Sequence, residues 1–371
     1  MGFIDRRLIT HINWGLLAAM LALFLVGIGN LYSASGVRVE GGISLAPYYE
    51  RQIIWGCMGF VLMIVCMSFD YRLLQVLAFP FFLAIVFSLG LIPVFGKVIY
   101  GARRWIDLGF FHFQPSEMAK IAVLLMGAQV LSLTGEPLRW KRLFQVASVG
   151  MIPAAFVVMQ PDLGTALTIL AILGGMILYH GLHRRVFQFC LVTIPLLPPI
   201  AWFFLLHDYQ KQRILTFLDP TNDPRGAGYH IIQSQIAIGS GQLWGKGFLQ
   251  GTQSQLSFLP EKHTDFAVAV FAEEWGFVGC VVLMGLFCLF LLGIYNTARD
   301  AKDRFGSTLA AGIFIYFFWQ IFINTGMVVG IMPVVGIPLP FISYGGSATL
   351  VNFALVGLVL NISMRRFLFK S

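Results

Sequence analysis

Residues 259–295 read LPEKHTDFAVAVFAEEWGFVGCVVLMGLFCLFLLGIY, a polar segment followed by a long apolar run. The polar part ends at Asp265, and the run that begins at Phe266 exceeds the ~20 residues that a helix needs to cross a membrane. Asp265 is therefore predicted at the mouth of a membrane helix, where a carboxylate is costly unless it has a partner or a task.

The composition is that of a membrane protein. Hydrophobic residues make up 58% of the 371 residues, charged residues make up 11%, and there are 35 phenylalanines. Because a soluble domain carries about 25% charged residues, this chain has too little polar surface to face water. The five cysteines lie in apolar runs without metal-ligand spacing, so we expect them to be core residues.

Ten apolar segments predict an all-α polytopic membrane protein with ten transmembrane helices. The predicted spans are about 14–34, 53–69, 73–95, 117–134, 145–159, 165–182, 186–206, 266–295, 307–330 and 348–364. We expect a single membrane domain covering 1–371, with one long extracytoplasmic loop at about 207–264 between helices 7 and 8.

Basic residues set the predicted orientation. With ten spans both termini share a side, and that side carries 14 of the 25 Lys and Arg residues in short segments. They are Arg6, Arg7, Arg72, Arg139, Lys141, Arg142, Arg184, Arg185, Arg299, Lys302, Arg304, Arg365, Arg366 and Lys370. The positive-inside rule makes this side cytoplasmic, so the +8 net charge reads as an orientation signal and not as a nucleic-acid footprint. The first apolar run predicts a signal anchor and not a cleavable signal peptide.

Acidic residues gather near the outer helix ends. Seven of the 17 acidic residues fall there, namely Asp107, Glu117, Asp162, Glu261, Asp265, Glu273 and Glu274. Charges inside membrane helices usually face a polar cavity or a partner, since each costs ~2.5–3.5 kcal/mol on insertion scales. In this topology Glu117, Asp162 and Asp265 lie at the ends of three helices and could ring one outward-facing cavity.

The segment before the fourth span carries a basic pair and an acid. Ser116 is the predicted helix N-cap, and Glu117 and Lys120 share a helix face at i, i+3 spacing. Two interpretations stay open: a structural ion pair, or a site in which Arg103, Arg104 and Lys120 bind an anion such as a pyrophosphate.

Other outer segments leave alternatives as well. Asp162 either caps the sixth helix within a tight turn or pairs across the cavity. Tyr229, Ile232 and Ile236 predict one face of a short amphipathic helix on the outer membrane surface. The glycine-rich run 239–247 departs from the nucleotide-loop pattern, and we interpret it as a flexible turn.

Two further features are less specific. At 100° per residue, Glu273 and Glu274 cannot both share the face of Asp265, so we expect at least one of them to be structural. The uncharged segment 332–347 has three prolines and suits a re-entrant turn, in which Ser343 could line a sugar site.

Five motifs together resemble the SEDS family (shape, elongation, division and sporulation). They are Phe113-Gln114-Pro115-Ser116-Glu117, Gln160-Pro161-Asp162-Leu163-Gly164-Thr165, Gly228-Tyr229-His230-Ile231-Ile232-Gln233-Ser234, Leu259-Pro260-Glu261-Lys262-His263-Thr264-Asp265-Phe266 and Pro340-Phe341-Ile342-Ser343-Tyr344-Gly345-Gly346-Ser347. The resemblance covers practically the whole chain. The stretches 207–210 and 251–255 look like the elongation branch and not the division branch.

The resemblance implies a peptidoglycan glycosyltransferase that polymerises lipid II, with a nascent glycan strand as the second substrate. It implies as partners a class B penicillin-binding protein and other elongation-complex proteins, in a bacterial inner membrane. By motif matching, Asp265 is the family's essential aspartate, and Glu117, Lys120 and Asp162 are supporting polar positions. Arg104 falls at a basic position, and Lys262 departs from an Arg found in relatives.

These residues suggest an inverting transfer with Asp265 as the base and Glu117 and Asp162 orienting Lys120 or holding a cation. Arg103, Arg104, Lys120, Arg213, Lys262 and Ser343 are the predicted substrate contacts. No cofactor is certain, and a divalent cation such as Mg²⁺ could neutralise the leaving pyrophosphate. A lipid II flippase and a non-catalytic scaffold for a transpeptidase are the rival functions.

Overall fold

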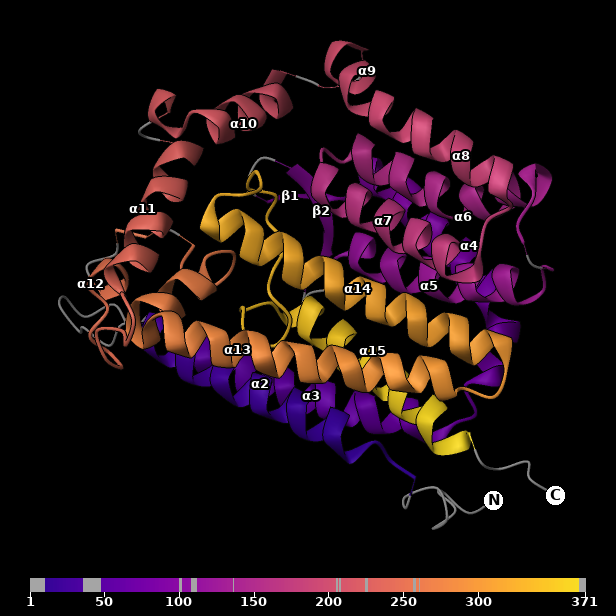
Figure 1. The fold of residues 1–371 in the computed structure, drawn as a ribbon, viewed down its shortest axis with the longest axis horizontal. Helices are drawn as coiled ribbons and strands as arrows, with labels where there is room; N and C mark the ends of the chain where they lie inside the picture. Colours follow the sequence, from indigo (N-terminus) through magenta and orange to yellow (C-terminus); the bar gives the residue numbers. More distant parts are fainter. Residues whose placement is uncertain are drawn as a thin grey trace.

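The computed structural model describes residues 11–35, 48–99, 102–107, 112–135, 137–204, 206, 208–223, 226–255, 258–259 and 261–366. Most of them form helices packed side by side, and the start of the first helix and the end of the last lie at the same end of the bundle (Figure 1). Three basic residues of the predicted orientation signal, Arg6, Arg7 and Lys370, lie outside the described residues, as does the side chain of Asp107.

The apolar runs predicted from the sequence fold as long helices. In chain order these are α2 (Trp14–Ala34), α3 (Tyr48–Ser68), α4 (Arg72–Phe95), α5 (Pro115–Ser132), α6 (Trp140–Met159), α7 (Leu163–His180), α8 (Arg184–Thr193) continued through η1 (Ile194–Leu196) into α9 (Leu197–Phe204), α13 (Ala267–Asp300), α14 (Arg304–Val329) and α15 (Gly346–Arg365). The protein is thus an all-α polytopic membrane protein, as predicted.

Within the described ranges, nine helices are long and apolar enough to cross a membrane. The predicted span 117–134 forms as α5 but is not among the nine. It is 18 residues long and carries Glu117 and Lys120 in its first two turns. The count of ten spans therefore stays a prediction.

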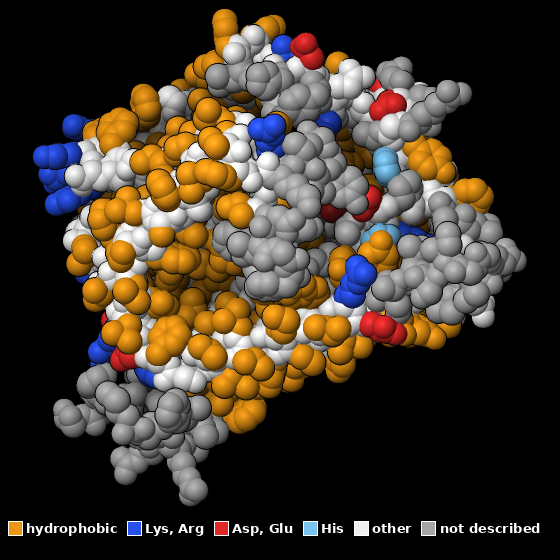
Figure 2. Space-filling model, turned by 180° about the vertical axis from the view of Figure 1, so that it is seen from behind, with side chains coloured by type: hydrophobic (Ala, Val, Ile, Leu, Met, Phe, Trp, Pro, Cys, Tyr) orange, Lys and Arg blue, Asp and Glu red, His pale blue; other side chains and the backbone are white. Residues whose placement is uncertain are grey.

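Helices α5 and α15 lie in the interior of the bundle. Helix α5 packs against α4, α6, α7 and α14, and α15 packs against α3 and α14. Both helices are buried around most of their circumference, whereas hydrophobic side chains of α4, α8 and α9 are exposed. Seen from behind, hydrophobic side chains cover much of the left-hand and lower parts of the molecule, and a group of Lys and Arg side chains lies at its left edge (Figure 2). A band of exposed apolar side chains is what contact with lipid requires.

Three short strands form a feature that the sequence prediction omitted. β1 (Lys97–Ile99), β2 (Ala102–Asp107) and β3 (His112–Phe113) pair antiparallel in that order between α4 and α5. The register pairs Val98 with Arg103 and Ile106 with Phe113. This small sheet fixes the course of the chain that carries Arg103 and Arg104.

The predicted extracytoplasmic loop contains helices of its own. They are α10 (Asp208–Leu218), η2 (Pro220–Asn222), α11 (Ala227–Ser240) and α12 (Thr252–Gln255), gathered at the end of the bundle away from Arg366 (Figure 1). The short amphipathic helix is confirmed as α11. Its face toward α13 and α14 is Ile231, Ser234 and Ala237, whereas Ile236 is half-exposed. The predicted apolar stripe is therefore not the face that packs on the bundle.

Helix α13 breaks at Gly276, where the sequence predicted a continuous span. Gly276 has φ 63° and ψ −164°, which is backbone geometry that only glycine adopts readily. The turn 242–247 compensates for the broken ladder: Phe277 N donates to Gln242 O at 2.8 Å, and Lys246 N donates to Glu273 O at 3.0 Å. The glycine-rich run is thus a turn, as predicted, but it is fixed to α13 by backbone hydrogen bonds.

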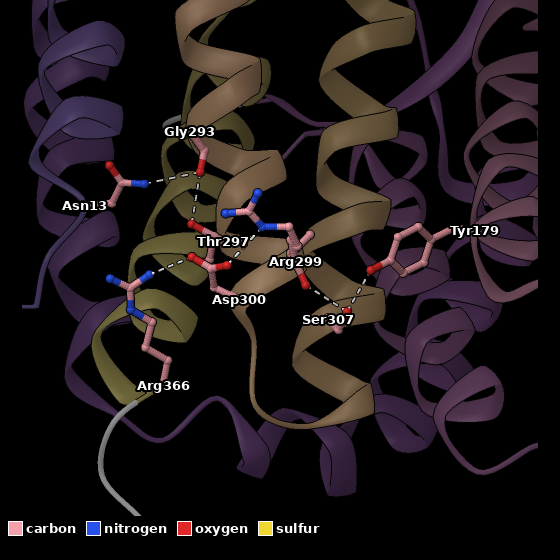
Figure 3. Close-up of polar contacts among 9 residues, drawn as sticks. Asn13, Tyr179, Gly293, Thr297, Arg299, Asp300, Ser307 and Arg366 are labelled. Atoms are coloured by element: carbon pink, nitrogen blue, oxygen red, sulfur yellow. Dashed lines mark hydrogen bonds and ion pairs between the residues drawn. The ribbon is translucent and has the colours of Figure 1, made fainter.

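Polar contacts tie the helices together at the end of the bundle that holds Arg366. Asp300 accepts from Arg299 and Arg366, both at 3.1 Å, which links α13 to the end of α15 (Figure 3). The Tyr179 and Ser307 hydroxyls lie 2.8 Å apart and join α7 to α14 (Figure 3). These contacts hold the end of the bundle opposite Asp265.

Candidate active site

Asp265 lies in a turn, residues 261–266, directly before α13. Glu261 O accepts from Thr264 N at 3.1 Å and from Phe266 N at 3.3 Å, which closes the turn. The Asp265 side chain is partly buried, and a methyl group added at Gly336 would lie 3.5 Å from its Oδ2. The carboxylate therefore faces the backbone of the segment before α15.

The surroundings of Asp265 favour its protonated form. The pKa of Asp265 is raised to about 6, mainly by burial and also by the Glu261 carboxylate, while the Arg213 guanidinium opposes the rise. Desolvation disfavours the charged carboxylate, and a like charge nearby acts in the same direction. A carboxyl group with a pKa near 6 is suited to accept a proton at neutral pH.

His263 takes part in holding this turn. Its backbone O accepts from Tyr344 N at 2.8 Å, and its ring stacks on Tyr48 with centroids 4.0 Å apart. These contacts are structural, and the ring is held by stacking. Its Nδ1 is buried without a hydrogen-bond partner among the described residues.

Glu117 and Lys120 form the ion pair that their spacing predicted. Lys120 Nζ donates to Glu117 Oε1 at 2.8 Å, and the two residues are only 3% and 8% exposed, respectively. Lys120 Nζ also lies 5.5 Å from the ring centroid of Tyr316 on α14. Glu117 Oε2 is buried and has no hydrogen-bond partner in the described part of the chain. The N-cap of α5 is Gln114 and not Ser116, because Pro115 already lies within the helix.

Asp162 combines the two interpretations that the sequence left open. Its Oδ1 caps α7 by accepting from Thr165 N at 3.2 Å, and its Oδ2 lies 3.5 Å from Arg104 Nη1. Arg104 also donates to the backbone oxygens of Gln160 at 3.1 Å and Pro161 at 2.5 Å. Arg104 is therefore a clamp between β2 and the turn before α7.

The other predicted substrate contacts differ in burial and in their hydrogen bonds within the protein. Arg103 Nη1 donates to Pro93 O at 3.0 Å, and the Ser343 hydroxyl is buried and accepts from Leu339 N at 3.0 Å. Arg213 is exposed on α10, and Lys262 is partly buried, so that burial lowers the pKa of Lys262. Arg213 is thus the basic side chain whose charge acts on Asp265, and Lys262 lies in the same turn as Asp265.

Neighbouring segments connect the three carboxylates, but within the described ranges no hydrogen bond or ion pair joins one carboxylate to another. Gly164 lies two residues after Asp162. It packs so closely on Val335 that a methyl group added at Gly164 would lie 2.2 Å from Val335 Cγ1. Val335 is the neighbour of Gly336, which faces Asp265. Tyr316, which lies beside Lys120, is two turns before Asn324 on α14, about 12 Å along the helix axis. Asn324 contacts the backbone oxygen of Asp265. Lys120 and Asp265 therefore lie at different depths along the bundle.

Both glutamates of α13 have structural contacts. Glu273 accepts from Lys246 Nζ at 2.7 Å, from Thr252 Oγ1 at 3.0 Å and from Gln253 N at 3.1 Å. Glu274 accepts from the hydroxyl of Ser33 on α2. The prediction that at least one of the two is structural is confirmed.

No group of three or more His, Cys, Asp or Glu side chains in the described ranges is arranged to hold a metal ion. Glu117 and Asp162, the proposed cation ligands, are each paired with a basic side chain instead. The acidic side chains that the structure describes thus form no closed divalent-cation site.

The sequence reasoning missed one set of buried polar residues. Tyr316, Gln320 and Asn324 are fully or almost fully buried and follow one another at i, i+4 spacing along α14. Polar residues at helical spacing inside an apolar run are a visible signal, because each is costly in a membrane without a partner. Asn324 donates to Asp265 O at 3.1 Å, which places it directly behind the candidate base.

The family follows from the match to the whole chain. A family model for FtsW, RodA and SpoVE, described as "Cell cycle protein", matches residues 14–367. The chain belongs to this family. This confirms the resemblance derived from the five motifs.

Named relatives of this FtsW, RodA and SpoVE family are similar over nearly their full length. The chain is 44% identical to peptidoglycan glycosyltransferase MrdB of Escherichia coli (strain K12), covering 96% of this chain and 94% of the relative. It is 33% identical to peptidoglycan glycosyltransferase RodA of Treponema pallidum, covering 97% and 99%.

Two solved structures of similar proteins agree in fold. One belongs to a study of structural coordination of polymerization and crosslinking by a peptidoglycan synthase complex, with TM-score 0.81, 32% identity and coverage of 96% of this chain and 98% of that one. The other is the rod shape determining protein RodA of Thermus thermophilus, with TM-score 0.71, 28% identity and the same coverage.

Proposed function

We propose that this chain is a peptidoglycan glycosyltransferase that polymerises lipid II at the outer face of the bacterial cytoplasmic membrane during cell elongation. The names of its relatives support the activity. The observation that carries the site is Asp265: a partly buried carboxyl group with a pKa of about 6, in a turn at the end of the bundle away from Arg366.

The reaction needs a base and a stabilised leaving group. The 4-hydroxyl of a GlcNAc attacks the anomeric carbon of a MurNAc, the new C–O bond forms, and the bond to the lipid pyrophosphate breaks with its electron pair on the pyrophosphate oxygen. Asp265 accepts the hydroxyl proton, since it is mostly ionised above its pKa of about 6. The linkage inverts from α to β, so no covalent enzyme intermediate is required.

Positive charge near the reacting atoms would stabilise the departing pyrophosphate. Arg213, which is exposed, acts on Asp265 through its charge, and Lys262 lies in the same turn as Asp265. Glu117 orients Lys120 through their 2.8 Å contact. Asp162 orients Arg104 and not Lys120. The proposed role of Asp162 is therefore to shape the turn before α7.

The partner we propose is a class B penicillin-binding protein acting as transpeptidase. The similar structure from a peptidoglycan synthase complex that coordinates polymerization and crosslinking supports this pairing. The proposed orientation puts both termini in the cytoplasm and Asp265 outside. Basic residues at the opposite end of the bundle, such as Arg299 and Arg366, support that orientation.

The test is polymerisation of lipid II by the purified chain with its transpeptidase partner present. Removing a general base costs ~10²–10⁴-fold in rate, so we expect Asp265→Asn to lose at least 100-fold in glycan formed per minute. Asp208→Asn, which changes an exposed carboxylate on α10, is the matched control and should keep the wild-type rate. Wild-type polymerisation by Asp265→Asn would remove Asp265 from the role of base.

A further inference from the structure

A fully buried asparagine lies behind Asp265. Asn324 of α14 is 0% exposed, and its Nδ2 donates to Asp265 O at 3.1 Å and to Ile337 O at 2.8 Å. Because carbonyl oxygens only accept, the orientation of the carboxamide is determined: the NH₂ group must face both. Its two N–H bonds are thereby both used.

The two carbonyls belong to the two backbone segments that face each other at the candidate base. Ile337 follows Gly336, which has a φ of +76° that favours glycine and lies beside Asp265 Oδ2. Asn324 therefore bridges the turn that carries the carboxylate and the segment on which the carboxylate lies.

A second asparagine supports the same turn from another helix. Asn30 of α2 is buried, and its Nδ2 donates to Ala267 O at 2.9 Å. Asp265 and Ala267 are thus held from α14 and α2 on either side of Phe266, which is itself buried. The turn has little freedom to move relative to the bundle.

We infer that Asn324 is a positioning residue for Asp265: its carboxamide fixes the Asp265 turn against the 336–337 segment and so fixes the direction of the carboxylate. This inference rests on the proposed function, in which Asp265 accepts the proton of the acceptor hydroxyl.

The physical reason is that loss of Asn324 removes the side-chain donor that the Asp265 and Ile337 carbonyls share. A buried backbone carbonyl without a hydrogen bond is destabilised, so the turn would shift to find a new donor. Shifting a catalytic group by about 1 Å can cost on the order of 100-fold in rate. A loss of Asn324 should therefore appear in kcat much more than in KM.

The experiment compares variants of the full-length chain, with its transpeptidase partner, in the lipid II polymerisation assay. Asn324→Leu keeps the side-chain size and removes both donors. The matched control is Asn361→Leu: Asn361 is also 0% exposed and donates to two backbone oxygens, those of Cys66 and Phe69, each at 2.6 Å, on the far side of the bundle. Melting temperature is measured for every variant.

We expect Asn324→Leu to lower kcat by about 10- to 100-fold, with KM changed less than about threefold. Asn361→Leu should lose a similar amount of melting temperature and keep its kcat. Wild-type kcat in folded Asn324→Leu, or an equal loss in both variants, would overturn the inference.

Asn324→Asp decides the question if Asn324→Leu does not fold. A carboxyl group in this buried site, facing two carbonyl oxygens, stays protonated and can donate to only one of them. We therefore expect kcat to fall in Asn324→Asp as well, while Asn361→Asp keeps its kcat. Wild-type kcat in Asn324→Asp would contradict the positioning role.

Asp265→Asn is measured alongside to separate the two claims. If Asp265→Asn is inactive and Asn324→Leu behaves as wild type, only the positioning role is lost. If Asp265→Asn polymerises at the wild-type rate, the base assignment is lost whatever Asn324 does.

Discussion

Two neighbouring charges act on the pKa of Asp265, so replacing either residue should change that pKa. Glu261 and Arg213 act on the carboxyl group in opposite directions, and burial is the larger effect. The activity of an enzyme that uses Asp265 as its base should fall as pH drops through about 6, because the carboxylate becomes protonated and can no longer accept a proton.

Neutralising each neighbour should move this acid limb in a predictable direction. Glu261→Gln removes the negative charge that raises the pKa of Asp265, so the limb of kcat/KM moves to lower pH. Arg213→Gln removes the positive charge that lowers it, so the limb moves to higher pH. Rates across pH 4.5–9 provide the test, and shifts of the same sign in both variants would contradict the assignment.

At the scale of elements, the turn 242–247 and α13 depend on each other. The break at Gly276 leaves backbone groups that the turn satisfies, and Lys246 reaches back to the buried carboxylate of Glu273. The first two turns of α13 are thus clamped between this contact and the Asp265 turn. The clamp offers a reason for a glycine-rich sequence at 239–247 that needs no phosphate ligand.

Replacing Lys246 should destabilise the contact between the turn 242–247 and α13 more than replacing its partner Glu273. Lys246→Met leaves Glu273 buried and without its cation, which we expect to cost about 1–3 kcal/mol in unfolding free energy. Glu273→Gln keeps an oxygen that accepts from Thr252 and from Gln253 N, so its cost should stay below about 1 kcal/mol. Thermal unfolding and hydrogen exchange over 242–253 measure both effects.

The double variant is the control for this pair. Once Glu273→Gln has removed the buried negative charge, the loss of Lys246 leaves no unpaired charge. The double variant Lys246→Met, Glu273→Gln should therefore be more stable than Lys246→Met alone. Strictly additive losses, or unchanged exchange in Lys246→Met, would show that the ion pair does not hold the turn.

Local signals explain which elements could be predicted. Apolar runs and flanking charges gave the long helices, and i, i+3 spacing gave the Glu117–Lys120 pair. The break at Gly276 and the carbonyl contacts of Arg104 depend on segments distant in the chain, here 242–247 and 160–161. The spacing of Tyr316, Gln320 and Asn324 is visible in the sequence, but the role of Asn324 could not be predicted, because its partners at 265 and 337 meet only in the fold.

At the scale of the whole molecule, the polar groups are distributed unevenly between the two ends. Asp265, Asp162 and Arg104 lie in the segments near the turns that join helices away from Arg366, whereas Asp300 and Arg366 close the opposite end. A polymerase acting on the outer leaflet needs its chemistry at one face only. A flippase would need a polar path between both faces.

The most direct measurement uses proteoliposomes in which the chain and its partner are inserted in one orientation and lipid II is supplied only in the leaflet on the Asp265 side. The proposed function predicts glycan strands from this substrate at the wild-type rate, and at least 100-fold less from Asp265→Asn. Polymer formed only from lipid II in the opposite leaflet, or loss of lipid II from the Asp265 side without any glycan, would contradict it.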